Sequence, residues 1–89
     1  MARVAFTQNL ERHVACPPQE VPGSTLREVL TNAFADNPEA RGYVLDDHGE
    51  LRLHMVVFID GRQVRDRRGL SDPVPEGGEV YVMQALSGG

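Results

Sequence analysis

The sequence contains no lysine and no tryptophan, has a single cysteine, Cys16, and has no long apolar run. With one cysteine, no disulfide can form within the chain, so stability must come from packing, and a reducing, cytoplasmic setting is expected. No segment approaches the roughly 18 apolar residues of a membrane span, and the first residues include no apolar run long enough for a signal peptide. We therefore predict a protein that does not bind or enter membranes.

Charge excludes further functions. The 89 residues carry a formal net charge of −4, which argues against non-specific nucleic-acid binding. The basic residues are all arginine, so no side-chain amine could accept an isopeptide bond from a second copy of the chain. The sequence shows no nucleophile–base pair and no metal-ligand spacing.

Two short strands are predicted before the first helix. Residues 3–7 alternate polar and apolar side chains, with Val4 and Phe6 facing inward. A second strand over residues 13–21 is interrupted by Pro17-Pro18. Because proline cannot donate to a ladder, this strand suits the edge of a sheet.

The helix that follows has a clear start and stop. Thr25 and Glu28 have the spacing of a capping box, in which each side chain satisfies a free amide at the helix start. Asn37-Pro38 should end the helix, because a residue before proline avoids the α region. The apolar side chains form one continuous stripe: Leu26, Val29, Leu30, Ala33 and Phe34. Residues 39–50 receive no assignment beyond a turn at residues 46–49.

The C-terminal half predicts three strands. In residues 54–59 both the odd-numbered and the even-numbered positions carry apolar side chains, as in a strand that is covered on both faces. Asp60-Gly61 is a preferred hairpin pair, and residues 62–64 form the return strand. Leu70 is expected to fill the core, and residues 79–85 form the last strand.

This order of elements predicts an α+β protein with a β-grasp fold. A mixed sheet of four to five strands would wrap around one main helix, with the first and last strands parallel at its centre. The domain is expected to span residues 1–83, and residues 84–89 a flexible tail that ends in Gly88-Gly89. Because glycine has no Cβ, such a tail can thread a narrow channel and present its carboxylate to another enzyme.

Four segments in order carry a resemblance to a known family. They are residues 58–64 (FIDGRQV), Gly69-Leu70, residues 74–82 (VPEGGEVYV) and Gly88-Gly89. Together they resemble the ubiquitin-like sulfur carriers of the MoaD/ThiS group, which include the small subunit of molybdopterin synthase and the thiamine-biosynthesis carrier. They are also similar to bacterial carriers that donate sulfur for cysteine assembly. Gln84-Ala85 stands where molybdopterin-type members commonly have proline, so the pathway is left open.

The resemblance implies a carrier mechanism. An ATP-dependent activating enzyme would adenylate the carboxylate of Gly89, a sulfur source would displace AMP, and the resulting thiocarboxylate would give its sulfur to a second enzyme, a synthase. Gly88 would keep the reacting end unhindered. No cofactor is expected on the chain itself, since ATP is used by the partner. Two alternatives are a ubiquitin-like modifier that is joined to target lysines and a non-catalytic β-grasp interaction module.

Docking on such partners needs a surface. Strand parity turns Val57 and Ile59 inward, which leaves Phe58, Tyr81 and Met83 as an exposed apolar patch beside the tail. We predict that these three side chains, with Leu86 in the tail, bind the partner.

Other reactive residue types have simpler interpretations. Cys16 is predicted to be a small buried hydrophobe rather than a sulfur relay. The arginine-rich segment 62–68 is predicted to be a solvated hairpin and loop rather than a docking patch. The histidines lack metal-ligand spacing and are expected to be structural or on the surface: His13, His48 and His54.

Overall fold

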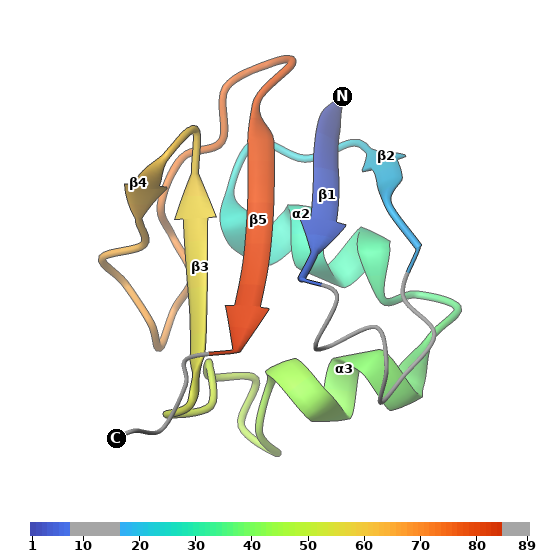
Figure 1. Cartoon of the computed structure of the whole chain (residues 1–89), viewed down its shortest axis with the longest axis vertical. Helices are drawn as coiled ribbons and strands as arrows, with labels where there is room; N and C mark the ends of the chain where they lie inside the picture. The colour runs from blue at the N-terminus through green and yellow to red at the C-terminus, as the bar shows by residue number, and fades with distance from the viewer. Residues whose placement is uncertain (8–16, 85–89) are drawn as a thin grey trace.

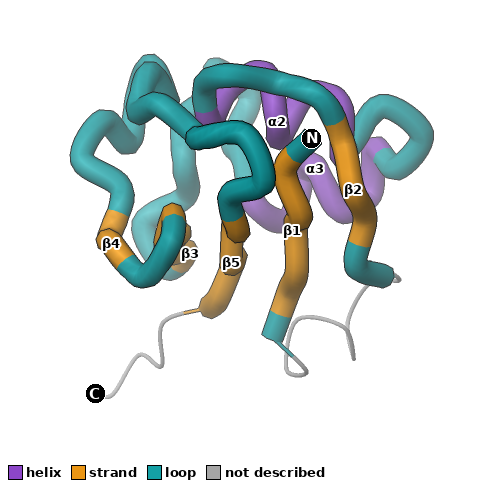
Figure 2. Tube along the Cα trace, turned by 90° about the horizontal axis from the view of Figure 1, so that it is seen from above, coloured by secondary structure: helices purple, strands orange, loops and turns teal. Residues whose placement is uncertain are grey.

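The computed structural model describes residues 1–7 and 17–84 and contains one mixed sheet with two helices. The strands are β1 (Ala2–Phe6), β2 (Gln19–Val21), β3 (Met55–Ile59), β4 (Arg62–Gln63) and β5 (Glu79–Gln84). The helices are α2 (Leu26–Ala33) and α3 (Pro38–Val44). Both helices lie on the same face of the sheet, as Figure 2 shows from above. The predicted α+β, β-grasp architecture is confirmed.

The sheet has the order β2-β1-β5-β3-β4, so β5 lies at its centre (Figure 1). β1 and β5 run parallel, with Val4 opposite Val80 and Phe6 opposite Val82. The other neighbouring pairs are antiparallel. The predicted parallel pairing of the first and last strands is therefore confirmed, and the short strand β2 occupies one edge.

Helix α2 supplies the helical side of the core. The predicted apolar stripe is buried along its whole length, and the rings of Phe6 and Phe34 lie 5.9 Å apart. The Thr25 hydroxyl accepts a hydrogen bond from the Glu28 amide at 3.3 Å, as predicted. The Glu28 carboxylate accepts from the Ser24 amide at 2.9 Å, one residue before the expected partner. Both contacts stabilise the helix start.

The second helix, α3, was missed in the sequence. The Asn37 side chain accepts a hydrogen bond from the Ala40 amide at 3.1 Å, and Pro38 is the first helical residue. Helix α2 already ends at Ala33, so the pair expected to end it instead starts α3, because proline needs no amide partner at the first helical position. Helix α3 is 7 residues long and buries Ala40 and Val44, too few positions for an apolar period to stand out in the sequence.

Strand β3 differs from the expectation on one face. Met55, Val57 and Ile59 are buried under the helices, whereas Val56 and Phe58 on the opposite face are only half-buried. A continuous apolar run indicates burial on both faces only when both faces are covered. In this sheet the described helices cover one face, so the apolar residues of the other face form a surface.

The connections follow the predicted turn chemistry. Asp60 and Gly61 have φ angles of 50° and 83°, which suit a two-residue hairpin turn between β3 and β4. Leu70 is 1% exposed and fills the core from a loop, as predicted. The turn at residues 46–49 is also present.

Candidate docking surface beside the C-terminal tail

The predicted reactive end lies outside the described residues. This applies to Leu86, Gly88 and Gly89, and also to His13 and Cys16. The last described residue, Gln84, still belongs to β5 and pairs with Met55 at the start of β3. The chain therefore leaves the sheet at the end where β3 begins, in the lower part of Figure 1.

The structure brings the predicted apolar residues together on the face opposite the helices. Phe58 lies opposite Tyr81, and Val56 lies opposite Met83. Tyr81 is 42% exposed, and the other three side chains are half-buried. We call these four residues the outer-face patch. It is less exposed than the sequence suggested, because neighbouring side chains on a pleated sheet cover one another.

Charge is confined to the far end of the same face. Arg3 lies opposite Glu20 on β2 and opposite Glu79 on β5, and all three are exposed. The order along β5 is thus charged Glu79, aromatic Tyr81 and apolar Met83 toward the tail. A partner that reaches the tail meets the apolar end of this face.

Leu53 adds an apolar side chain that was missed in the sequence. It is 96% exposed and lies in the turn that leads into β3. The Met55 amide donates to the Arg52 carbonyl at 2.9 Å, which closes the turn with Leu53 at its corner. Because Met55 pairs with Gln84, the turn lies at the tail end of the sheet. Residues 51–53 carry no glycine, proline or asparagine that would have marked a turn in the sequence.

Arg67 holds the Leu53 turn in place. Its Nη2 atom donates to the Arg52 carbonyl at 2.7 Å and to the Met55 carbonyl at 2.8 Å. The Arg67 carbonyl in turn accepts from the Leu51 amide at 2.9 Å. The expectation of a wholly solvated arginine loop is wrong for Arg67, which is half-buried and structural, because one guanidinium can satisfy two carbonyls at once.

Asp66 fixes the loop that carries Arg67. Its carboxylate accepts from the Ser71 hydroxyl at 2.6 Å and from the Gly69 amide at 2.8 Å. These hydrogen bonds, that from Ser71 first, lower the pKa of Asp66 to about 2 because they favour the charged carboxylate. The loop is thus organised by a side chain that is ionised at neutral pH.

The remaining predicted surface residues are spread out. Arg62, Arg65 and Arg68 are exposed, as are His48 and His54. Across residues 1–7 and 17–84, no group of three or more metal-ligating side chains is close enough to hold an ion. In the same part of the chain, no helix has the length and apolar character needed to cross a bilayer.

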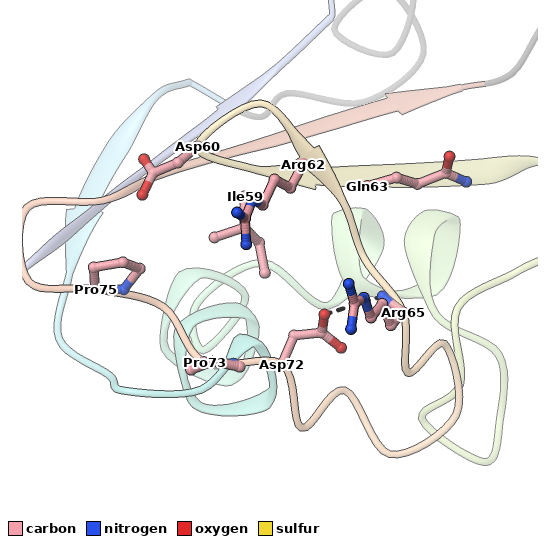
Figure 3. A pocket seen from close by; sticks show the side chains of 8 residues that line it. All are labelled: Ile59, Asp60, Arg62, Gln63, Arg65, Asp72, Pro73 and Pro75. Atoms are coloured by element: carbon pink, nitrogen blue, oxygen red, sulfur yellow. Dashed lines mark hydrogen bonds between the residues drawn. The ribbon is translucent and has the colours of Figure 1, made fainter.

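A cavity of about 460 Å³ lies between the β3–β4 hairpin and the loop at residues 71–75 (Figure 3). Arg62 and Arg65 line it together with two carboxylates, and Ile59, Pro73 and Pro75 supply apolar atoms. Both carboxylates accept backbone hydrogen bonds: Asp72 from the Arg65 amide at 3.0 Å, and Asp60 from the Glu79 amide at 2.9 Å. Its charges are of both signs, so it favours no ligand of one charge.

No protein-family model and no curated protein sequence matches the chain. Solved structures do. A SAMP1 structure from Haloferax volcanii has a TM-score of 0.76 at 24% identity and covers 99% of this chain and 98% of its own. A chain in the structure of the Amycolatopsis orientalis BexX/CysO complex has a TM-score of 0.82 at 20% identity. This match covers 100% of our chain and 100% of that chain.

Another CysO, from Mycobacterium tuberculosis, has a TM-score of 0.79 at 20% identity and covers 97% of this chain and all of its own. At these identities the likeness is one of fold, and it agrees with the resemblance seen in the C-terminal half of the sequence. The chain therefore has the ubiquitin-like β-grasp fold, with a five-stranded mixed sheet packed on two helices.

Proposed function

We propose that this protein is a sulfur carrier, a co-substrate whose Gly89 carboxylate is activated and then carries sulfur to a second enzyme. The observation that supports this most is the combination of a ubiquitin-like β-grasp body with a sequence ending in Gly88-Gly89 just after the central strand β5. The resemblance to the sulfur carriers runs through β3, β4 and β5, the elements nearest to the tail.

The chemistry needs only the terminal carboxylate of this chain. An α-carboxyl has a pKa of about 3.3–3.7, so it is ionised at neutral pH and can attack the α-phosphorus of ATP. Pyrophosphate leaves and an acyl adenylate forms. Hydrosulfide then attacks the acyl carbon and AMP leaves. The C–O bond to AMP is thus replaced by a C–S bond, and neither carbon nor sulfur changes its oxidation state.

The body of the protein contributes recognition. The outer-face patch lies on the sheet face that the described helices leave uncovered, and it adjoins the strand end from which the tail departs. Leu53 extends this apolar area around the same end of the sheet. Phe58, Tyr81, Met83 and, in the tail, Leu86 are therefore assigned to contacts with the activating enzyme and with the sulfur-accepting synthase. Because Gln84 belongs to β5, the expected tail is residues 85–89, which would span on the order of 17 Å when extended, enough to enter a partner's active site.

The test is an intact-mass measurement in a reconstituted reaction. The protein is incubated with the adenylating enzyme of its own organism, ATP and sulfide, and we expect the mass change of one oxygen replaced by sulfur. A variant lacking Gly89 serves as the control, because it keeps every described residue and loses the reacting group. A sulfur gain in the Gly89-deleted variant, or none in the full chain, would contradict the assignment.

A second candidate function is protein modification. One structural neighbour, from Methanosarcina acetivorans, is described as a small archaeal modifier protein, and it has a TM-score of 0.80 at 20% identity. Acyl adenylates also react with lysine amines, so the same activated tail would serve conjugation. The absence of lysine from this chain prevents chains in which copies are joined through side-chain isopeptide bonds. Covalent adducts between Gly89 and other proteins in the same reaction would favour this function.

The proposal also bears on which biosynthetic pathway would accept the sulfur. Molybdopterin, thiamine and cysteine biosynthesis each use a thiocarboxylate carrier of this shape in the family that the sequence resembles. Gln84 pairs with Met55 and completes β5, so the segment where molybdopterin-type members carry proline is here partly a strand. This favours a pathway other than molybdopterin assembly.

A further inference from the structure

A second cavity lies on the helix side of the molecule, away from the outer-face patch. It has a volume of about 310 Å³ and is bounded by α2, α3 and the turn at residues 46–49. Buried apolar side chains form its base: Leu30, Phe34, Leu45 and Leu70. Thr31, Ala35 and Pro38 are exposed and form one wall. The surface offered to a ligand is therefore largely aliphatic.

Among residues 1–7 and 17–84, the charged residues that line this cavity are two arginines, and no acidic side chain of this part of the chain lines it. Arg27 is held in place because its Nε donates to the Gly69 carbonyl at 2.9 Å and its Nη2 to the Arg68 carbonyl at 3.2 Å. Its Nη1 remains available. Arg41 is exposed, and within residues 1–7 and 17–84 its guanidinium has no hydrogen bond or ion pair.

Gly49 brings the two guanidinium groups to one point. A methyl group built on this buried glycine would lie 3.6 Å from Nη1 of Arg27 and 4.0 Å from Nη2 of Arg41. Apart from its own chain neighbours, no other atom of the described part of the chain would lie within 4 Å of that methyl group. An atom near this point therefore contacts both cations. Because arginine stays protonated in proteins, the repulsion between them is relieved by an anion and not by loss of a proton.

The turn that carries Gly49 is rigid. Asp46 Oδ1 accepts from the His48 amide at 2.8 Å and from the Glu50 amide at 3.0 Å, and the Gly49 amide donates to the Asp46 carbonyl at 3.0 Å. The hydrogen bond from Glu50 is the main cause that lowers the pKa of Asp46. The Asp46 carboxylate of this turn is thus engaged by backbone amides of its own turn.

The cavity at the β3–β4 hairpin provides the contrast. Figure 3 shows Arg62 beside Ile59, with Asp72 and Arg65 close together on the other side. The two arginines there share their cavity with Asp60 and Asp72. Among residues 1–7 and 17–84, the lining of the cavity at Gly49 differs in that its charged residues are both arginines, in a protein whose net charge is −4.

From these observations we infer that the cavity between α2 and α3 binds a small carboxylate with a branched aliphatic body. The carboxylate lies over Gly49 between Arg27 and Arg41, and the aliphatic part lies against Ala35 and Pro38. Charge-assisted hydrogen bonds to the guanidinium groups fix the orientation of the ligand. The site is remote from the tail, so this inference does not depend on the proposed sulfur chemistry.

The test is an NMR titration of the isolated protein with isocaproate. The reporters are the Gly49 amide and the Arg27 Nε–H, and a dissociation constant on the order of 1 mM is expected for a ligand of this size. Arg41→Gln removes one cation that has no structural hydrogen bond and should weaken binding about tenfold. Arg62→Gln makes the same charge change in the other cavity and should leave the constant unchanged.

Two further probes separate charge from shape. Isocaproamide keeps the aliphatic body without the charge, and acetate keeps the charge without the body; both should bind at least about fivefold more weakly than isocaproate. Equal binding of the amide would overturn the role of the arginines, and equal binding of acetate would overturn that of the apolar wall. Isocaproate that leaves Gly49 unshifted, or binds Arg41→Gln and wild type alike, would overturn the site itself.

Discussion

At the scale of single residues, two charged side chains in one loop set the shape of the tail end of the sheet. Asp66 accepts hydrogen bonds from its own loop, and Arg67 donates to the Arg52 and Met55 carbonyls of the Leu53 turn. Neither contact has a signature in the sequence, where both residues belong to a charged segment with the composition of a solvated loop. The Arg67 contacts join residues that are distant in the sequence, so they depend on the fold and cannot be seen in local patterns.

We predict that Ser71→Ala raises the pKa of Asp66 from about 2 toward its ordinary value of 3.8, because the hydroxyl that donates at 2.6 Å is removed. A carboxyl whose pKa is lowered by folding stabilises the protein above its unfolded pKa, and this stabilisation is lost as the pH falls from about 4 to about 2. The variant should therefore lose less stability across this window. An NMR titration of the Asp66 carboxyl carbon measures the shift, and an unchanged pKa would contradict the assignment.

A second prediction concerns Arg67. In Arg67→Gln the Leu53 turn loses a guanidinium that serves two carbonyls, so we expect faster hydrogen exchange of the Met55 amide, by about tenfold or more. Arg68→Gln is the matched control, because Arg68 is exposed and its side chain makes no hydrogen bond in residues 1–7 and 17–84. Equal exchange in the two variants would show that Arg67 does not hold the turn.

At the scale of elements, the sequence predicts what is regular and misses what is short. The apolar stripe on α2 and the alternation of apolar and polar side chains on β1 and β5 are long enough to show the helical and the strand period in the sequence. The Asp60-Gly61 pair locates the hairpin. Helix α3 has too few buried positions to show a period. Burial on both faces of β3 was inferred from composition, which cannot tell a covered face from an interaction surface.

The core role of α2 gives a prediction of stability. Leu30 is fully buried, so Leu30→Ala should lower the free energy of unfolding by about 2–5 kcal/mol through lost burial and the cavity that remains. Thr31→Ala, on the exposed side of the same helix, should change it by at most about 0.5 kcal/mol. Urea unfolding measures both. Similar losses in the two variants would contradict the assignment of the buried face.

The outer-face patch gives a prediction of binding. Tyr81→Ser and Leu53→Ser should each weaken binding to the activating enzyme by about tenfold or more, because apolar side chains at the centre of an interface carry most of its energy. Glu79→Gln lies on the same strand and face but at the charged end, and should have little effect. Calorimetric titration measures the affinities, and circular dichroism checks that each variant is folded. Wild-type affinity in both serine variants would remove the patch from the interface.

At the scale of the whole molecule, the proposed sites lie on different sides of the sheet. The helices cover one face and leave the other uncovered (Figure 2), and β5 ends beside the start of β3 (Figure 1). The cavity with Arg27 and Arg41 lies on the helix side, so a ligand there would not compete with docking on the opposite face. In the proposed function this body needs no catalytic side chain, since the proposed reacting group is the carboxylate of Gly89.

The central claim is that the carboxylate of Gly89 carries sulfur, and the most direct measurement is the mass of the protein from its own cells. The protein is isolated with an N-terminal tag, treated at once with iodoacetamide, and weighed intact. We predict one alkylated thiocarboxylate, located at Gly89 by fragmentation and absent from the Gly89-deleted variant. A free, unlabelled carboxylate at Gly89 in cells that are actively making sulfur-containing metabolites, or a tail found only in amide linkage to other proteins, would contradict the account.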